Sequence, residues 1–223
     1  LVPGSVTPGS LTINYNTSPG ALSITGVSGG NGVYSYQWQS SVNTSSWSNI
    51  SGATASSYTP PAITVKTYYR ANVTSNGSTY PANYATVNVY PQIIGGDISP
   101  ASATINYNTA PGTLTLSGVS GGNGAYSYQW QSSPDGSNWT NIIGATTGTY
   151  APPALTSPTR YSVGVTSNGV VAFSNSSTIG VYPQVAGGSV SPGLLNINYN
   201  TSPGVLSLSG VSGGNGAYTY QWQ

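Results

Sequence analysis

The sequence predicts an all-β protein made of tandem β-sandwich modules. No stretch carries the 3.6-residue period of an amphipathic helix, and Gly, Pro, Asn, Ser and Thr recur at roughly the 8–12-residue spacing of sandwich proteins. Between these turn residues, apolar and polar side chains alternate, which directs one face of each strand inward and the other to water. The pattern then repeats along the chain, so several similar sandwiches are expected in series.

The repeat defines the domain organisation. The run Ile13–Thr17 returns as Ile105–Thr109 and Ile197–Thr201, so both offsets are 92 residues (105 − 13 and 197 − 105). We therefore expect module 1 at residues 1–92, module 2 at 93–184 and the N-terminal part of module 3 at 185–223. A period of this length suits an independently folding domain rather than a solenoid unit. The short joins favour modules stacked end to end, and the incomplete third module predicts that the parent protein continues.

Each strand of module 2 is expected from one alternating segment. The inward residues are Ala103, Ile105 and Tyr107, then Leu114 and Leu116, then Tyr126, Tyr128 and Trp130, then Tyr161, Val163 and Val165, and last Ile179 and Val181. Turns are expected at residues 121–124, 134–136 and 167–169, where Gly, Pro, Asp and Asn gather. About seven strands per module, with an inward Trp on the third main strand, is the pattern of an immunoglobulin-type (Ig-like) sandwich.

Five aromatic residues are expected in the core of these sandwiches. Three stand where the buried Trp of the Ig-like fold belongs and two where its corner Tyr belongs: Trp38, Trp130, Trp222, Tyr69 and Tyr161. The Cys that usually lies two residues after the corner Tyr is replaced by Ala71 and Val163. The predicted sandwich therefore has no disulfide and depends on packing alone.

The composition excludes most enzyme chemistry. The 223 residues include 3 Lys+Arg, 2 Asp+Glu, no His and no Cys, and charged residues make up 2%, against about 25% in an average soluble protein. A His-activated nucleophile and a zinc site both lack their residues. A net charge of +1 gives no electrostatic footprint for nucleic acid. We expect no enzyme activity, no metal, no cofactor and no nucleic-acid partner.

Two motifs resemble ligand sites but are better interpreted as turns. The Gly-rich run Gly118–Gly124 lacks the Lys and the following helix of a phosphate-binding loop. Asp135 lies in a loop that could suggest calcium, but calcium needs several carboxylates and no second acid is near in the sequence. Module 1 has Asn43 at the same position, which also favours a structural role.

Four aromatic residues remain as candidates for surface or glycan contact. Trp47 and Trp139 lie on a strand beside a loop, and Tyr80 and Phe173 follow the hairpin of each module. Aromatic side chains in such places could stack on a sugar ring. The alternative is that they cover the rim of the sandwich.

The run Tyr126–Thr147, followed by Thr149–Leu155 and Tyr161, resembles the tandem Ig-like repeats of giant Bacteroidota cell-surface adhesins. The most similar type is the SprB-like gliding-motility adhesin, a substrate of the type IX secretion system. The resemblance covers both full modules and the partial third. It implies an extracellular filament, attached to the outer membrane through other parts of the parent protein.

The same resemblance implies the function and the partners. The filament would provide reach and multivalent attachment during gliding. Its partners would be an extracellular surface or polysaccharide, neighbouring modules of the same chain, and the secretion or motility machinery of the outer membrane. The alternative is a set of carbohydrate-binding or spacer modules in a large secreted enzyme.

Overall fold

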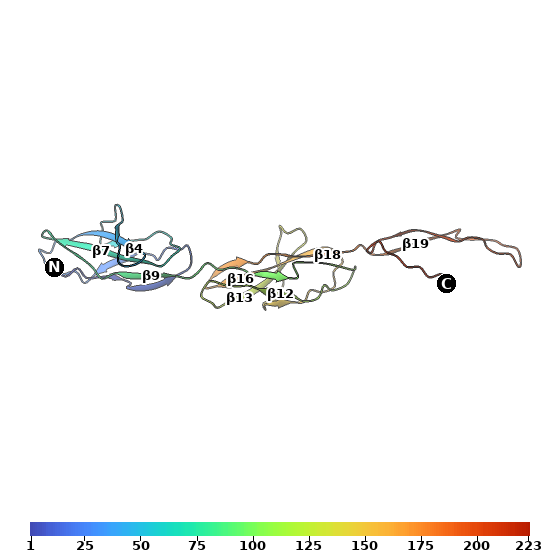
Figure 1. The fold of residues 1–223 in the computed structure, drawn as a ribbon, viewed down its shortest axis with the longest axis horizontal. Helices are drawn as coiled ribbons and strands as arrows, with labels where there is room; N and C mark the ends of the chain where they lie inside the picture. The colour runs from blue at the N-terminus through green and yellow to red at the C-terminus, as the bar shows by residue number, and fades with distance from the viewer. The chain divides into compact units, whose positions relative to one another are not determined.

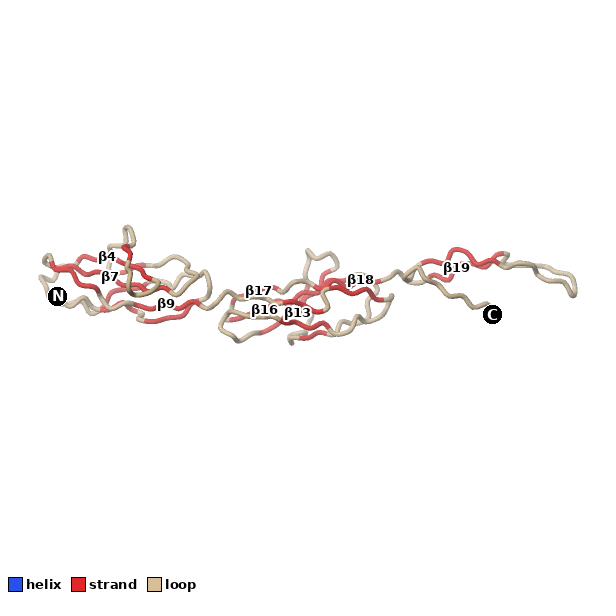
Figure 2. Tube along the Cα trace, viewed as in Figure 1, coloured by secondary structure: helices blue, strands red, loops and turns tan.

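The computed structural model describes residues 1–223, and its regular elements are all strands (Figures 1 and 2). The chain divides into two compact units. The first consists of Leu1–Ile94 with Ser120–Tyr126 and Thr166–Val171, and the second of Gly95–Val119, Ser127–Val165 and Ala172–Gln223. No helix is present that has the length and apolar character to span a membrane. The predicted all-β class is confirmed.

Module 1 is built from nine strands in two sheets. The strands are β1 (Ser5–Thr7), β2 (Ser10–Ile13), β3 (Leu22–Thr25), β4 (Ser35–Ser41), β5 (Ser48–Asn49), β6 (Ser57–Tyr58), β7 (Thr67–Ser75), β8 (Ser78–Pro81) and β9 (Ala85–Val89). One sheet has the order β1-β3-β6, and the larger has the order β2-β9-β7-β4-β5 with β8 paired to β7. The chain changes sheets between β1 and β2, and β2 pairs parallel to β9.

Module 2 repeats this arrangement strand for strand. Its strands are β10 (Asp97–Ser99), β11 (Ser102–Ile105), β12 (Leu114–Ser117), β13 (Ser127–Ser133), β14 (Thr140–Asn141), β15 (Thr149–Tyr150), β16 (Thr159–Ser167), β17 (Val170–Phe173) and β18 (Ser177–Val181). The sheets have the orders β10-β12-β15 and β11-β18-β16-β13-β14, with β17 paired to β16. Both modules are Ig-like β-sandwiches, as the sequence predicts. The predicted inward Tyr107 differs, since β11 ends at Ile105 and Tyr107 is 37% exposed.

Alternation along β7 explains why the sheets pack on each other. Every second residue from Thr67 to Ser75 is buried, and the residues between them are partly exposed. Trp38 lies opposite Ala71 on the neighbouring strand and is fully buried. Ala71 and its module 2 counterpart Val163, which stand where the disulfide would be, are also fully buried. Apolar packing therefore fills the position of the absent bridge.

The buried Trp of each module contacts residues at equivalent positions of the repeat. Trp38 donates its indole N–H to the carbonyl of Ala55 at 2.9 Å, and Trp130 donates to that of Thr147 at 2.8 Å. The Trp38 ring lies 5.8 Å from Tyr58, and the Trp130 ring lies 5.7 Å from Tyr150. The indole N–H is the only polar group of a Trp side chain, and without this hydrogen bond it would be buried without a partner.

Tyr69 and Tyr161 complete these aromatic clusters. Their rings lie 6.2 Å from Tyr58 and 5.8 Å from Tyr150, respectively. Both are almost fully buried. Because burial disfavours the charged phenolate, it raises the pKa of each to about 12.

The predicted Gly-rich turn of module 2 is hydrogen-bonded to Ser167, the last residue of β16. Ser167 donates its hydroxyl to Asn123 Oδ1 at 2.8 Å and accepts the Asn123 backbone N–H at 3.0 Å. Gly122, at φ 59°, lies against the Ser167 side chain with no space for a Cβ. The Gly-rich run is therefore a packed turn, which explains its composition.

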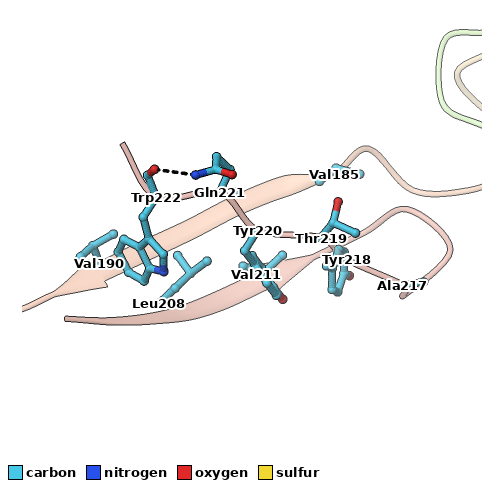
Figure 3. A pocket seen from close by; sticks show the side chains of 11 residues that line it. Val185, Val190, Leu208, Val211, Ala217, Tyr218, Thr219, Tyr220, Gln221 and Trp222 are labelled. Carbon is cyan, nitrogen blue, oxygen red and sulfur yellow. Dashed lines mark hydrogen bonds between the residues drawn. The ribbon is translucent and has the colours of Figure 1, made fainter. Parts of the chain in front are cut away.

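Residues 185–223 form a single hairpin of β19 (Ala186–Ser191) and β20 (Ser207–Ser212). Trp222, expected in a core, is 53% exposed. The reason is that β15–β18, which complete the sandwich around Trp130 in module 2, have no counterpart within these residues. Trp222 and Tyr220 instead lie beside Leu208 and Val211 at an open apolar groove of about 510 Å³ (Figure 3).

Candidate functional site

The two Trp candidates occupy equivalent loops, immediately before β5 in module 1 and β14 in module 2. In module 1, Asn43 Oδ1 accepts the N–H groups of Ser45 and Ser46 at 3.1 and 3.0 Å. Trp47 then donates its indole N–H to the carbonyl of Thr44 at 2.9 Å. The loop thus fixes the Trp ring by a hydrogen bond within four residues.

In module 2, Asp135 replaces Asn43 as the acceptor of this loop. Its Oδ1 accepts the N–H groups of Ser137 at 2.8 Å and Asn138 at 2.9 Å, and Trp139 donates its indole N–H to the carbonyl of Gly136 at 3.1 Å. Hydrogen bonds from the Asn138 and Ser137 backbone, then from the Asn138 and Ser133 side chains, hold the pKa of Asp135 well below its ordinary value. The carboxylate is part of the turn, and no group of three or more His, Cys, Asp or Glu side chains gathers anywhere in the chain.

A cation covers Trp47 in module 1. The Arg70 guanidinium carbon lies 4.2 Å from the centre of the Trp47 ring. Arg70 Nε donates to Gln39 Oε1 at 2.8 Å, and Gln39 Nε2 donates to Asn49 Oδ1 at 2.8 Å. Partial burial disfavours the charged form and lowers the pKa of Arg70 below its ordinary value. The indole face and the amide oxygen beside it are both occupied by Arg70.

Tyrosines extend this module 1 cluster along the outer face of the larger sheet. Tyr84 lies 6.0 Å from Trp47, and Tyr68 meets Tyr84 edge-on at 5.5 Å. Lys66 Nζ lies 5.0 Å from the centre of the Tyr68 ring. The glycan candidate Tyr80 lies on β8, is 51% exposed and has no aromatic partner. The structure therefore does not bring Tyr80 to Trp47.

Module 2 has a groove at the equivalent place. The 92-residue offset puts Ser162 at the position of Arg70 and Ser176 at the position of Tyr84. A groove of about 490 Å³ opens here, lined by Gln131, Trp139, Ser162, Phe173, Ser174 and Ser176. The structure thus brings together Trp139 and Phe173, two of the four aromatic candidates.

The polar groups of the groove differ in how far they are engaged. Gln131 Nε2 donates to Asn141 Oδ1 at 2.7 Å, but Gln131 Oε1 accepts no hydrogen bond. Ser174 accepts the Val163 N–H at 2.9 Å and donates to the Asn175 carbonyl at 2.7 Å. Ser162 makes only long contacts of 3.4 Å to Ser174. Ser162 is only 5% exposed, so Gln131 Oε1 is the group of the groove that is left for a ligand, and the small Ser162 lines the groove without filling it.

Arg70, Ser162 and Gln131 were not predicted as site residues from the sequence. The signal was present in the repeat, because residues on the outward face of β7 and β16 can be compared at the 92-residue offset. Both Trp side chains are partly buried, and Arg70 against Ser162 is the substitution that separates a Trp with a guanidinium on its ring from a Trp beside a groove.

One protein-family model matches the chain twice, once in each complete module. The family described as "Domain of unknown function (DUF8696)" matches residues 2–91 and again residues 94–183. No curated protein matches the chain.

Several solved structures are similar to the chain. The three N-terminal domains of the bacteriophage RB49 outer capsid protein Hoc share 16% identity over 82% of this chain and 69% of that chain, with a TM-score of 0.46. A marsupial T cell receptor shares 13% identity over 83% of this chain and 75% of that chain, with a TM-score of 0.49. The fibronectin(III)-like modules of Clostridium thermocellum CbhA share 13% identity over 82% and 90%, with a TM-score of 0.34.

Proposed function

The chain belongs to the DUF8696 family through both of its complete modules, and from that premise we propose that it is a repeat segment of a long cell-surface adhesin. The observation that supports this most is one scaffold used twice with two different outer faces. The cores around Trp38 and Trp130 match, whereas Arg70 covers Trp47 and an open groove lies beside Trp139. Repeated scaffolds provide reach, and their outer faces provide contacts.

The surface chemistry fits this role. With 2% charged residues, the chain must be solvated chiefly by hydroxyl and amide groups. Trypsin has three possible cleavage sites, Lys66, Arg70 and Arg160, which suits a protein exposed to extracellular proteases. Weak contacts from many tethered modules raise the effective concentration of each site, so attachment does not need one strong site.

A role in gliding is the more specific part of the proposal. Its support is the resemblance of Tyr126–Thr147 to repeats of the SprB-like adhesins. In this proposal the type IX secretion system exports the parent protein, the outer-membrane motility machinery moves it, and its modules attach to an external surface or polysaccharide.

Live-cell tracking tests this proposal. A fluorescent antibody fragment raised against the 223-residue chain is applied to cells that make the parent protein. Labels that travel along the cell body are expected. Fixed surface labels would contradict gliding and leave a static adhesin, and labels that reach their target only in permeabilised cells would contradict the surface location.

A second candidate function is favoured by the groove of module 2. A groove lined by aromatic, amide and hydroxyl side chains also fits a carbohydrate-binding or spacer module of a large secreted enzyme. A glycan array probed with the whole chain separates the two functions. Saturable binding to one defined glycan favours the carbohydrate-binding module, and weak binding to many surfaces favours the adhesin.

A further inference from the structure

We propose that the groove of module 2 binds an uncharged pyranose unit of a polysaccharide, and that module 1 is closed to the same ligand by Arg70 and Tyr84. This deepens the proposed function, because it names the chemistry through which such a segment would contact a polysaccharide. Module 2 is then a binding module, and module 1 is a scaffold of the same fold without that site.

The aromatic residues of the groove supply a stacking surface. Trp139 is held by its hydrogen bond to Gly136, so its ring is oriented before any ligand arrives. Phe173 is 61% exposed and forms another part of the lining. An aromatic face carries partial negative charge, and the C–H groups on one face of a pyranose carry partial positive charge. The two surfaces are therefore complementary in shape and charge.

The polar groups select a ligand that carries hydroxyls. Gln131 Oε1 has no donor in the protein, and the Ser162 hydroxyl has only long contacts. A sugar hydroxyl can donate to Gln131 Oε1, whereas Ser162, which is 5% exposed, lines the groove and leaves room for the ring. None of the lining side chains is charged. Arg160, two residues before Ser162 on β16, packs its side chain against Gly136 of the Trp139 loop and is not part of the lining. A charged sugar would lose hydration at this uncharged lining, so an uncharged sugar is favoured.

The size of the groove agrees with a small ligand. Its volume of about 490 Å³ lies within the roughly 300–1,000 Å³ of typical small-molecule sites. Because Phe173 extends into solvent, the groove is open rather than enclosed. It can therefore receive an internal unit of a polymer as well as a chain end.

Module 1 already satisfies internally the two groups that a sugar would use. The Arg70 guanidinium occupies the face of Trp47 at 4.2 Å and donates to Gln39 Oε1 at 2.8 Å. Tyr84, where module 2 has Ser176, lies 6.0 Å from the same Trp. A ligand would have to displace Arg70 from both the ring and the amide.

Affinity electrophoresis of the 223-residue chain tests the proposal. The gels contain hydroxyethylcellulose, soluble starch, galactomannan or polygalacturonate, the last as an acidic comparison. We expect at least one neutral polymer to retard the chain. Trp139→Ala and Ser162→Arg should raise the dissociation constant at least tenfold, whereas the matched control Trp47→Ala should change it less than twofold.

Ser162→Arg is the more specific test, because module 1 has Arg70 at this position beside Gln39 and folds with it. An unchanged melting temperature confirms that the variant is folded. Module 1 has Pro81 where module 2 has Phe173. The reverse change, Arg70→Ser with Tyr84→Ser and Pro81→Phe, should therefore open a second site and raise the number of sugar units bound per chain from one to two. Isothermal titration with an oligosaccharide of the retarding polymer measures this number.

Several outcomes would overturn the proposal. They are no retardation by any neutral polymer, retardation by polygalacturonate alone, wild-type retardation of both module 2 variants, or an equal loss in Trp47→Ala. An unchanged number of sites in the Arg70, Tyr84 and Pro81 triple variant would overturn the closure of module 1. Cell-surface labelling is independent of the groove, so failure here leaves the adhesin proposal to its own test.

Discussion

Trp38 and Trp130 are both fully buried and make the same hydrogen bond, whereas Trp47 and Trp139 stand in different surroundings although their loops match. The pleat of the sheet explains how modules 1 and 2 can agree inside and differ outside. Neighbouring residues of a strand face opposite sides, so Ser162 can replace Arg70 while the buried residues beside it keep their packing. In these modules, the fold and the binding surface are set by separate sets of residues on the same strands.

The largest expected effect tests whether the cores are equivalent. Trp38→Ala and Trp130→Ala each remove a fully buried ring, and each should lower the free energy of unfolding of its module by about 3–5 kcal/mol. Denaturant unfolding of both variants measures this. Losses that differ by more than about 1 kcal/mol would show that the two cores are not equivalent. Trp47→Ala is the control, and it should lower the free energy of unfolding less because Trp47 is only partly buried.

Alkaline pH should weaken both modules through one buried Tyr each, and module 2 somewhat more, because burial also raises the pKa of Tyr150. Tyr69 and Tyr161 have a pKa raised from 10.0 to about 12 by burial. The folded state is stabilised in full while the pH is below the pKa of Tyr in the unfolded chain. That stability is lost as the pH rises from 10 to 12. Each module should lose roughly 2–3 kcal/mol over this range. Unfolding curves at several pH values, with Tyr69→Phe and Tyr161→Phe as controls, measure the loss. A module that keeps its stability from pH 10 to 12 would contradict the prediction.

The smallest expected effect separates the modules in acid. The hydrogen bonds that lower the pKa of Asp135 stabilise module 2 at pH values above the ordinary 3.8, and this contribution is lost as the pH falls below that value. Module 1 has the neutral Asn43 and should not respond. Asp135→Asn should remove the acid response of module 2, and Asn43→Asp should introduce one in module 1.

Melting temperatures at pH 5 and pH 2.5 measure this difference. Equal acid responses of the wild-type chain and the Asp135→Asn variant would contradict it. From about pH 4 to 9 the melting temperature should stay nearly constant, because the chain has only 3 Lys+Arg and 2 Asp+Glu. A drop above about 10 °C in that range would contradict the weak dependence on charge.

Much of the fold could be predicted because it depends on local pattern and on the repeat. Alternation predicted the strands around Trp130 and Val163, and turn residues predicted the Gly-rich turn and the hairpins. Trp222 matches Trp38 and Trp130 in pattern, and it is exposed because residues 185–223 correspond only to residues 93–131 of module 2. Burial depends on which strands cover a residue, and an alternating segment is the same whether or not an opposing sheet is present.

The candidate site was predicted only in part. Trp139 and Phe173 could be proposed as exposed aromatic residues, but their common groove depends on β17 pairing with β16 and on the small Ser162. The covering of Trp47 depends on the side-chain conformation of Arg70. A single sequence shows that Arg70 faces outward, but it does not show which neighbour a long side chain contacts.

The constant 92-residue offset also affects how the gene can recombine. A crossover between equivalent points of two copies of the repeat would change the number of modules and preserve both the reading frame and the module boundaries. Since Ser162 and Arg70 each occupy one codon beside codons for buried residues, such an exchange would redistribute open and covered grooves among intact sandwiches.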